Sequence, residues 1–154
     1  MKNKVFMNHR FGILVFTISL IVIAVFSCNE SSDRTPYGQA VNCIHTADFA
    51  GIKTLIGVDP TLVLKKENYD KRTLLHTVFS KGFFDSDARK MANLLIGAGS
   101  DVDAADDRGM TPAHCACFYG RDGAEALTYL VAKGAAVTLK DNSGKTPQDL
   151  LNSK

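Results

Sequence analysis

The sequence repeats itself at an interval of 35 residues, and this repetition constrains the fold more than any other feature. Residues 108–116, RGMTPAHCA, recur in part as residues 143–151, SGKTPQDLL. Residues 94–103, LLIGAGSDVD, align with residues 129–138, YLVAKGAAVT, at the same interval. A weaker copy, TLLH at residues 73–76, lies 38 residues before TPAH. This period indicates stacked supersecondary units, none of which buries its apolar face alone.

Local signals predict a pair of helices within each unit. Pro112 follows Thr111, and its fixed φ suits the first position of a helix. Gly120 and Gly134 stand where helices should end, because a residue past a helix terminus often needs a positive φ. The expected N-caps of the second helices are Asp122 in one unit and Asp85 or Ser86 in the unit before it. These second helices carry an apolar stripe at helical spacing: Met91, Leu94 and Leu95, then Leu127, Leu130 and Val131.

These motifs resemble the ankyrin repeat, a unit of about 33 residues that carries Gly-x-Thr-Pro-Leu-His-x-Ala and Leu-Leu-x-x-Gly-Ala-Asp-Val-Asn. The resemblance covers about residues 40–154. It implies an all-α solenoid of three to four helix-turn-helix units, preceded by an N-terminal signal or anchor helix. The units expected are a degenerate repeat at 41–68, complete repeats at 69–105 and 106–140, and a partial C-terminal cap repeat at 141–154.

The sequence departs from the family pattern at several places. Gly82 and Gly99 are 17 residues apart, where the family has about 12, so an insertion is expected between the helices of that unit. Lys71 replaces a glycine and Leu74 replaces the proline, which predicts a reshaped junction. The degenerate unit, with its first helix near residues 37–46, is expected to lack the Thr-Pro signature.

The N-terminus predicts export. An uncharged run of 16 residues, 11–26, follows Lys2, Lys4 and Arg10, and it is shorter than the roughly 20 residues that a membrane-spanning helix needs. VFSC at residues 25–28 resembles the lipobox of bacterial lipoproteins, with Phe26 as a departure, and this implies lipidation of Cys28. An uncleaved single-pass anchor and an ordinary cleaved signal remain alternatives. Residues 1–28 are thus a signal, and the polar residues 29–40 are expected to form a flexible tether.

Charge argues against nucleic acid as a partner. Of 18 basic and 16 acidic residues, the signal holds three basic ones, which leaves the mature chain with a net charge of −1. Such a surface cannot neutralise a phosphate backbone. The sequence predicts a protein partner and a monomer held at the membrane of the bacterial envelope by its N-terminus.

The sequence contains no recognisable catalytic motif, so no enzymatic activity, metal or cofactor is predicted. A metal- or thiol-dependent activity at His76, His114 and Cys115 remains the alternative. The resemblance implies instead that both histidines hydrogen-bond nearby backbone. Cys115 is expected to be partly accessible, whereas Cys43 and Cys117 are expected to be small buried residues.

The resemblance also implies a concave surface made by the hairpin tips and the first helices. Phe118 and Tyr119 are its strongest candidates for binding a protein partner, because aromatic and arginine side chains dominate interface hot spots. Phe118 packing on a neighbouring helix is the alternative. Phe83 and Phe84 form a second candidate patch, unless they fold under the insertion. The other surface candidates are Arg108, Met110, Asp107, Tyr69, Arg72 and Lys81, with Asp70, Ser80, Asn142, Ser143 and Lys145.

These inferences predict a membrane-tethered protein–protein interaction module. An immunity protein for a neighbouring toxin, an accessory protein for an exported enzyme, and a structural spacer without a dedicated partner are the alternatives.

Overall fold

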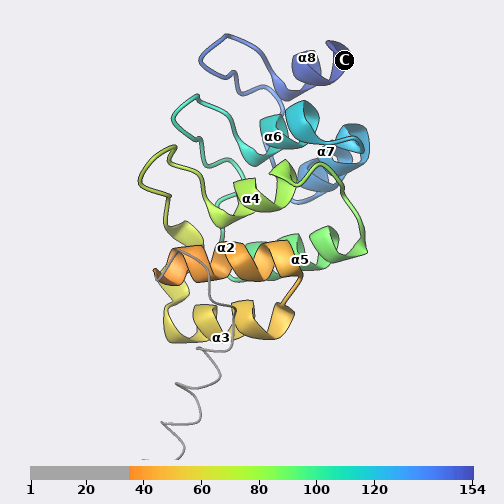
Figure 1. The fold of residues 1–154 in the computed structure, drawn as a ribbon. Helices are drawn as coiled ribbons and strands as arrows, with labels where there is room; N and C mark the ends of the chain where they lie inside the picture. Colours follow the sequence, from red (N-terminus) through yellow and green to blue (C-terminus); the bar gives the residue numbers. More distant parts are fainter. Residues whose placement is uncertain (1–34) are drawn as a thin grey trace, which may run out of the picture. The chain divides into compact units, whose positions relative to one another are not determined.

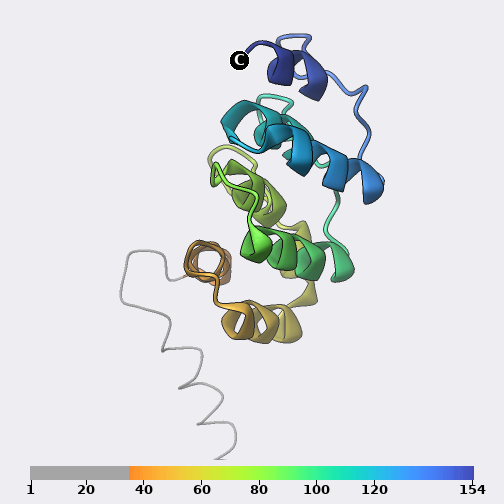
Figure 2. The same ribbon diagram turned by 90° about the vertical axis from the view of Figure 1, so that its right-hand side faces the viewer.

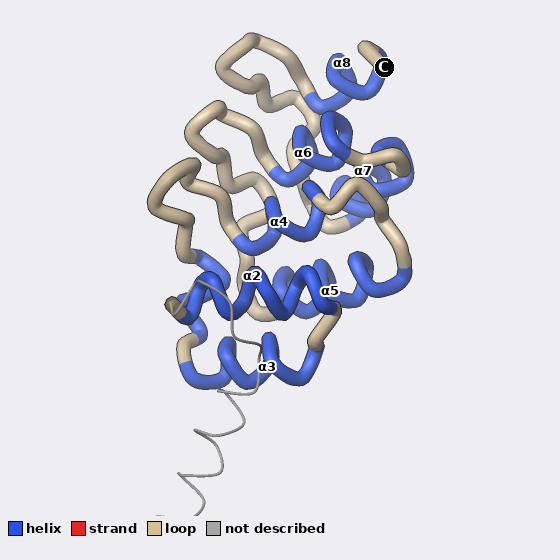
Figure 3. Tube along the Cα trace, viewed as in Figure 1, coloured by secondary structure: helices blue, strands red, loops and turns tan. Residues whose placement is uncertain are grey.

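The computed structural model describes residues 35–154, and this part of the chain consists of helices and loops without a strand (Figures 1 and 3). Each helix pair places its first helix in one layer and its second helix in a second layer, and the pairs stack on one another (Figure 2). The first helices are α2 (Pro36–Thr46), α4 (Leu74–Ser80), α6 (Pro112–Tyr119) and α8 (Pro147–Asn152). The second helices are α3 (Phe49–Val58), α5 (Ser86–Gly97) and α7 (Gly123–Ala132), and α3 is followed by the 3-10 helix η1 (Pro60–Leu64). The predicted all-α solenoid, with three helix pairs and a lone last helix, is confirmed.

Each first helix begins after a threonine in extended conformation. These N-caps are Thr35, Thr73, Thr111 and Thr146. The Thr35 hydroxyl accepts a hydrogen bond from the Gly38 amide, and Pro36 takes the first helical position. The degenerate unit therefore has the Thr-Pro signature that it was expected to lack. Its helix starts within residues 29–40, so the part of the predicted tether from Pro36 onward is helical instead.

A side chain of α4 and one of α6 hydrogen-bond to the backbone of the following unit. His76 accepts the Thr73 amide hydrogen at Nδ1, 3.1 Å away, so its Nε2 carries the proton and donates to the Met110 carbonyl at 3.0 Å. His114 lies in the same way between Thr111 and the Lys145 carbonyl. The structural role implied for both histidines is thus confirmed.

The loops that lead from one unit to the next, residues 65–73, 98–111 and 133–146, project from one side of the stack (Figure 1). We call these loops the fingers. The second and third fingers close through the amides of Asp106 and Asp141, which donate to the carbonyls of Met110 and Lys145. Successive fingers are also linked, because the Asp107 amide donates to the Asp70 carbonyl at 3.0 Å. We call the surface formed by the fingers and the first helices the finger face.

The first finger is reshaped in its closure, which joins the Glu67 amide to the Arg72 carbonyl five residues on instead of four. Lys71 nevertheless keeps the backbone conformation of the later fingers. Its φ is +59°, and Gly109 and Gly144 have φ values of +72° and +76° at the equivalent positions. The lysine thus adopts the left-handed conformation for which the family uses glycine.

Helix ends follow the predictions in part. The Asp85 carboxylate accepts hydrogen bonds from the Asp87 and Ala88 amides, which confirms it as the N-cap of α5. Asp122 precedes α7 but makes no capping bond, and it accepts from the Phe84 amide instead. Gly134 has the expected positive φ of +93°. Gly120 does not, with a φ of −76°; it must be small because a Cβ there would lie 2.4 Å from the Ala116 carbonyl oxygen.

The core lies between the two layers and continues from unit to unit. Leu75 of α4 and Leu95 of α5 are fully buried, and so are Ile52 of α3 and Leu130 of α7. Each such side chain stabilises the fold by about 1.5–3 kcal/mol. The insertion between α4 and α5 adds Phe84, which is 7% exposed and stacks on Phe79 at 5.5 Å between ring centroids.

Candidate functional site

A cluster of polar side chains on the finger face centres on Tyr119, the last residue of α6. Its hydroxyl oxygen accepts two hydrogen bonds, from Arg72 Nη2 at 3.0 Å and from Arg108 Nη2 at 2.9 Å. Arg72 lies in the first finger and Arg108 in the second. The Arg72 guanidinium also lies over the Tyr119 ring, 5.4 Å from its centroid. A single hydroxyl therefore joins two consecutive units.

Two carboxylates lie close to the arginines. Asp70 Oδ2 lies 3.0 Å from Arg72 Nε. The Asp106 side chain is fully buried, and its Oδ1 accepts the Arg108 and Met110 amides at 2.9 and 2.8 Å. Its Oδ2 lies 3.7 Å from both Arg72 Nε and Arg108 Nη2, which is an ion-pair distance without a hydrogen bond. The hydrogen bond to Tyr119 raises the pKa of Arg108, so this guanidinium stays charged.

An exposed aromatic ring lies next to this polar cluster. Phe118 is 51% exposed, and its ring meets Tyr119 edge-on at 4.8 Å. The Arg108 side chain is 48% exposed and that of Arg72 is 22% exposed. Arginine, tyrosine and phenylalanine thus reach the solvent side by side, in a combination that protein interfaces favour.

The finger face belongs to a recognised type of solenoid. A model of ankyrin repeats in three copies matches residues 39–141, which is more than half of the chain. The chain belongs to the ankyrin-repeat family. Ankyrin repeats generally mediate protein–protein interactions.

Relatives differ widely in size. A protein of Rickettsia felis named for its ankyrin repeats is 35% identical over 75 residues, which cover 49% of this chain and 31% of that protein. The E3 ubiquitin-protein ligase KEG of Arabidopsis thaliana is 29% identical over 116 residues, covering 71% of this chain and 7% of the ligase. An ankyrin repeat-containing protein of Schizosaccharomyces pombe is 36% identical over 52 residues, covering 34% of this chain and 24% of that protein. The chain spans less than a third of each of these relatives.

The ankyrin fold brings some of the predicted surface residues together and separates others. Arg72, Arg108, Phe118 and Tyr119 form the cluster described above. Met110 is only 5% exposed, because it lies at the base of the second finger, where its carbonyl accepts the bond from His76. It is therefore not a surface residue. The fingers carry further exposed candidates, of which Tyr69 is 91% exposed, together with Asp107, Asn142 and Ser143.

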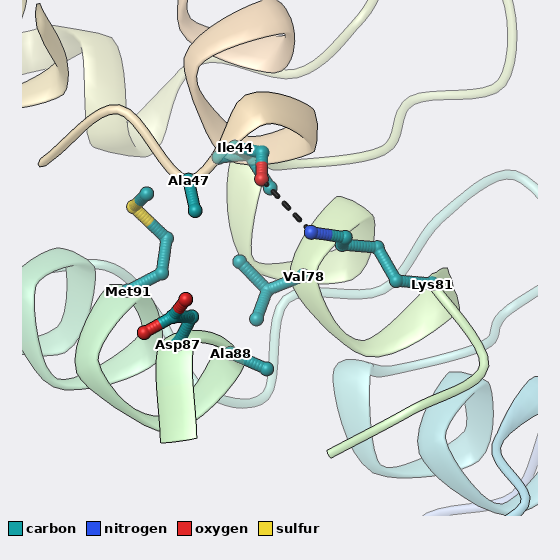
Figure 4. A pocket seen from close by; sticks show the side chains of 7 residues that line it. All are labelled: Ile44, Ala47, Val78, Lys81, Asp87, Ala88 and Met91. Atoms are coloured by element: carbon teal, nitrogen blue, oxygen red, sulfur yellow. Dashed lines mark hydrogen bonds between the residues drawn. The ribbon is translucent and has the colours of Figure 1, made fainter. Parts of the chain in front are cut away.

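Lys81 lies apart from the cluster at the end of α4. Its Nζ donates to the Ile44 carbonyl of α2 at 3.0 Å, beside a small hollow between α2, α4 and α5 (Figure 4). Val78 and Met91 line this hollow, and Asp87 lies at its edge. Its volume of about 10 Å³ accommodates about one water molecule, so it cannot hold a cofactor.

Two residues of the finger face, Asp106 and Tyr37, were not predicted from the sequence. Asp106 carries the clearest signal, because Asp141 repeats it 35 residues later and both close their fingers. Tyr37 was missed because it lay in the predicted tether. Its hydroxyl donates to the Arg72 carbonyl at 2.7 Å, as the histidines of later units donate to theirs.

Two of the histidines and all three cysteines of the described residues are buried, whereas His45 of α2 is exposed. His76, His114, Cys115 and Cys117 are each 0% exposed. The prediction that Cys115 is partly accessible is therefore wrong, and burial raises the pKa of its thiol to about 11. Within residues 35–154, no group of three or more histidine, cysteine, aspartate or glutamate side chains is arranged to hold a metal ion.

The aromatic pair of the insertion divides between surface and core. Phe84 is buried, whereas Phe83 is 56% exposed beneath the Arg121 guanidinium, 5.2 Å from the ring centroid. The predicted signal, residues 1–28 with Cys28, lies outside the described residues. Within the described part, no helix has the length and apolar character needed to cross a membrane.

Proposed function

We propose that this protein is a membrane-tethered interaction module of the bacterial cell envelope and binds its protein partner on the finger face. The observation that carries the proposal is the cluster of Arg72, Arg108 and Tyr119 beside the exposed Phe118. Hot spots of protein interfaces are enriched in arginine and aromatic residues that lie close together. The apolar run at residues 11–26 and the lipobox-like VFSC support the tether.

The opposite face, formed by α3, α5 and α7, is a poorer candidate. Its Arg89 pairs with Glu125 at 2.6 Å, and its guanidinium lies 4.8 Å from the Phe84 ring centroid and 5.3 Å from that of Tyr129. The hydrogen bond of Arg89 is thus already made to a carboxylate, whereas that of Arg108 is made to a neutral hydroxyl. The module proposed here acts by binding and not by catalysis, and in support His76 and His114 are already engaged in backbone hydrogen bonds while Cys115 and Cys117 are fully buried.

Site-specific photocrosslinking tests the binding surface. Phe118→benzoylphenylalanine places the crosslinker on the finger face, and Val131→benzoylphenylalanine places it at a site of matched exposure, 49%, on α7. We expect a discrete crosslinked partner from position 118 in intact cells and none from position 131. Arg108→Ala should weaken binding of the captured partner about 30-fold, the effect of losing a hot-spot residue worth about 2 kcal/mol.

Thermal unfolding of each variant provides the control for folding. Equal crosslinking from both positions, or crosslinking from position 131 alone, would place the partner elsewhere and refute the proposal.

A further inference from the structure

We propose that the partner presents an acidic side chain to the finger face, with its carboxylate held by Arg72, Arg108 and Tyr119 and an adjacent apolar residue packed on Phe118. This inference rests on the proposed function, since it names the chemistry that the same surface would recognise.

The first argument is the number of hydrogen-bond donors without acceptors. A guanidinium has five N–H groups, yet each of the two arginines makes one side-chain hydrogen bond, to the Tyr119 oxygen. Arg72 Nε additionally pairs with Asp70. Within residues 35–154, the hydroxyl proton of Tyr119 has no acceptor, because its oxygen only receives. The cluster therefore presents donors to solvent that an acceptor of a partner can engage.

The second argument is charge. Asp70 and Asp106 offset the two guanidiniums, so the cluster is close to neutral. However, the Asp106 side chain is fully buried and makes no hydrogen bond to either guanidinium. A carboxylate with one negative charge fits such a site better than a phosphate monoester with nearly two, because the second charge would face Asp70 and Asp106.

The third argument is geometry. The shared bonds to Tyr119 hold both guanidiniums at one place, where the exposed Arg108 can make the paired hydrogen bonds that carboxylates accept. The Phe118 ring lies edge-on to Tyr119 and remains half exposed. An acidic residue with an apolar neighbour matches both surfaces at once.

Peptide selection tests this chemistry while the identity of the partner is still open. The full chain, purified in detergent, is used to select from a displayed library of random linear peptides. We expect the selected peptides to share Asp or Glu close to an aliphatic or aromatic residue. Replacing that acid by its amide should weaken binding about 10-fold or more, as should Arg108→Gln and Tyr119→Phe in the protein. Arg89→Gln, which removes an arginine from the opposite face, should leave the affinity unchanged.

Arg108→Lys separates binding from folding. It keeps the positive charge but loses the planar fork of donors, so it should also weaken binding, with little change in melting temperature. Selected peptides that bind equally well as amides, or that bind Arg108→Gln normally, would overturn the inference. A phosphorylated peptide that binds more tightly than its acidic counterpart would show that the site prefers phosphate to carboxylate. That result would also overturn the inference. The proposed function fails separately, if position 118 crosslinks no partner in cells.

Discussion

Lys71 occupies a backbone position that glycine occupies in the two later units. Its φ of +59° places an L-residue in the left-handed region, which costs roughly 1–2 kcal/mol. The lysine makes one weak local contact in return, from Nζ to the Asn68 carbonyl at 3.2 Å. The first finger therefore contains a strained residue that the second and third fingers avoid.

Lys71→Gly should stabilise the protein by about 0.5 kcal/mol, because relief of the left-handed strain exceeds the added freedom of glycine in the unfolded chain. The reverse change, Gly144→Lys, serves as the matched control. A Cβ at position 144 meets no atom within 4 Å, so only the φ of +76° opposes it, and we expect a similar loss of stability. Urea unfolding measures both. A Lys71→Gly variant less stable than wild type would show that the lysine contributes more than its strain costs.

At the scale of elements, α2, α4 and α6 each donate a side-chain hydrogen bond across the boundary to the following unit. His76 must be neutral to do so, because its Nδ1 accepts the Thr73 amide hydrogen while Nε2 donates to Met110. Burial lowers the pKa of His76, which is the direction expected for a histidine held in its neutral form. Protonation at Nδ1 would remove that acceptor, so the boundary between α4 and the second finger should weaken in acid.

The sign of the pH dependence follows from this lowered pKa. Below the unfolded value of about 6.5, the unfolded chain binds the proton more readily than the folded one, so the stabilising contribution of His76 is complete above about pH 6.5 and declines as the pH falls toward its folded pKa. We expect the free energy of unfolding to fall between about pH 7.5 and pH 5.5 by at most about 1.4 kcal/mol per pH unit for this proton. His76→Gln, whose amide can still donate to Met110, should reduce that slope. An unchanged slope would assign the pH dependence to other groups.

The helix pairs were predictable because the 35-residue period repeats the whole pattern of caps and apolar positions. The first unit was harder to recognise. Thr35 and Pro36 carry the signature, but they lie in a polar stretch, and Gly38 stands where later units have histidine. Tyr37 replaces that histidine with a hydroxyl one position earlier, and this substitution becomes visible only when the Arg72 carbonyl is in place.

The finger face was predicted less completely than the fold. Arg108, Phe118 and Tyr119 were placed on it correctly, because the family leaves these positions exposed. The prediction was wrong for Met110, which was expected at the surface, and for Cys115, which was expected to be accessible. Both are covered by neighbouring parts of the stack, and such coverage depends on how units pack and not on local spacing. Asp106 was missed for a related reason, since its role depends on the two arginines close to it.

At the scale of the whole molecule, the solenoid presents one face that runs along every unit. Each unit of such a stack contacts mainly its neighbours, so a partner can lie across several of them. Under the proposed tether, the module acts where its N-terminus holds it. A lipid on Cys28 would restrict the finger face to partners within reach of the membrane surface, because several acyl chains anchor a protein stably.

Mass spectrometry of the mature N-terminus tests this tether. We expect a chain that begins at Cys28 and carries diacylglycerol, found in the membrane fraction. Cys28→Ser should prevent the modification and leave the protein with its uncleaved signal. Detection of an intact Met1 in the wild type would support the single-pass anchor instead. An unmodified, cleaved chain in the soluble fraction would contradict any tether.

The hydroxyl of Tyr119, which two arginines share, constrains how the sequence of this protein can evolve. The proposed recognition of a partner and the contact between the second and third units both depend on this oxygen, since Arg72 and Arg108 each donate to it. A variant selected for tighter binding at this cluster would also alter the contact between those units. A variant selected there for higher thermal stability would also alter the binding affinity. Binding affinity and stability should therefore change together in descendants of this sequence, whereas the outer tips of the fingers can vary independently.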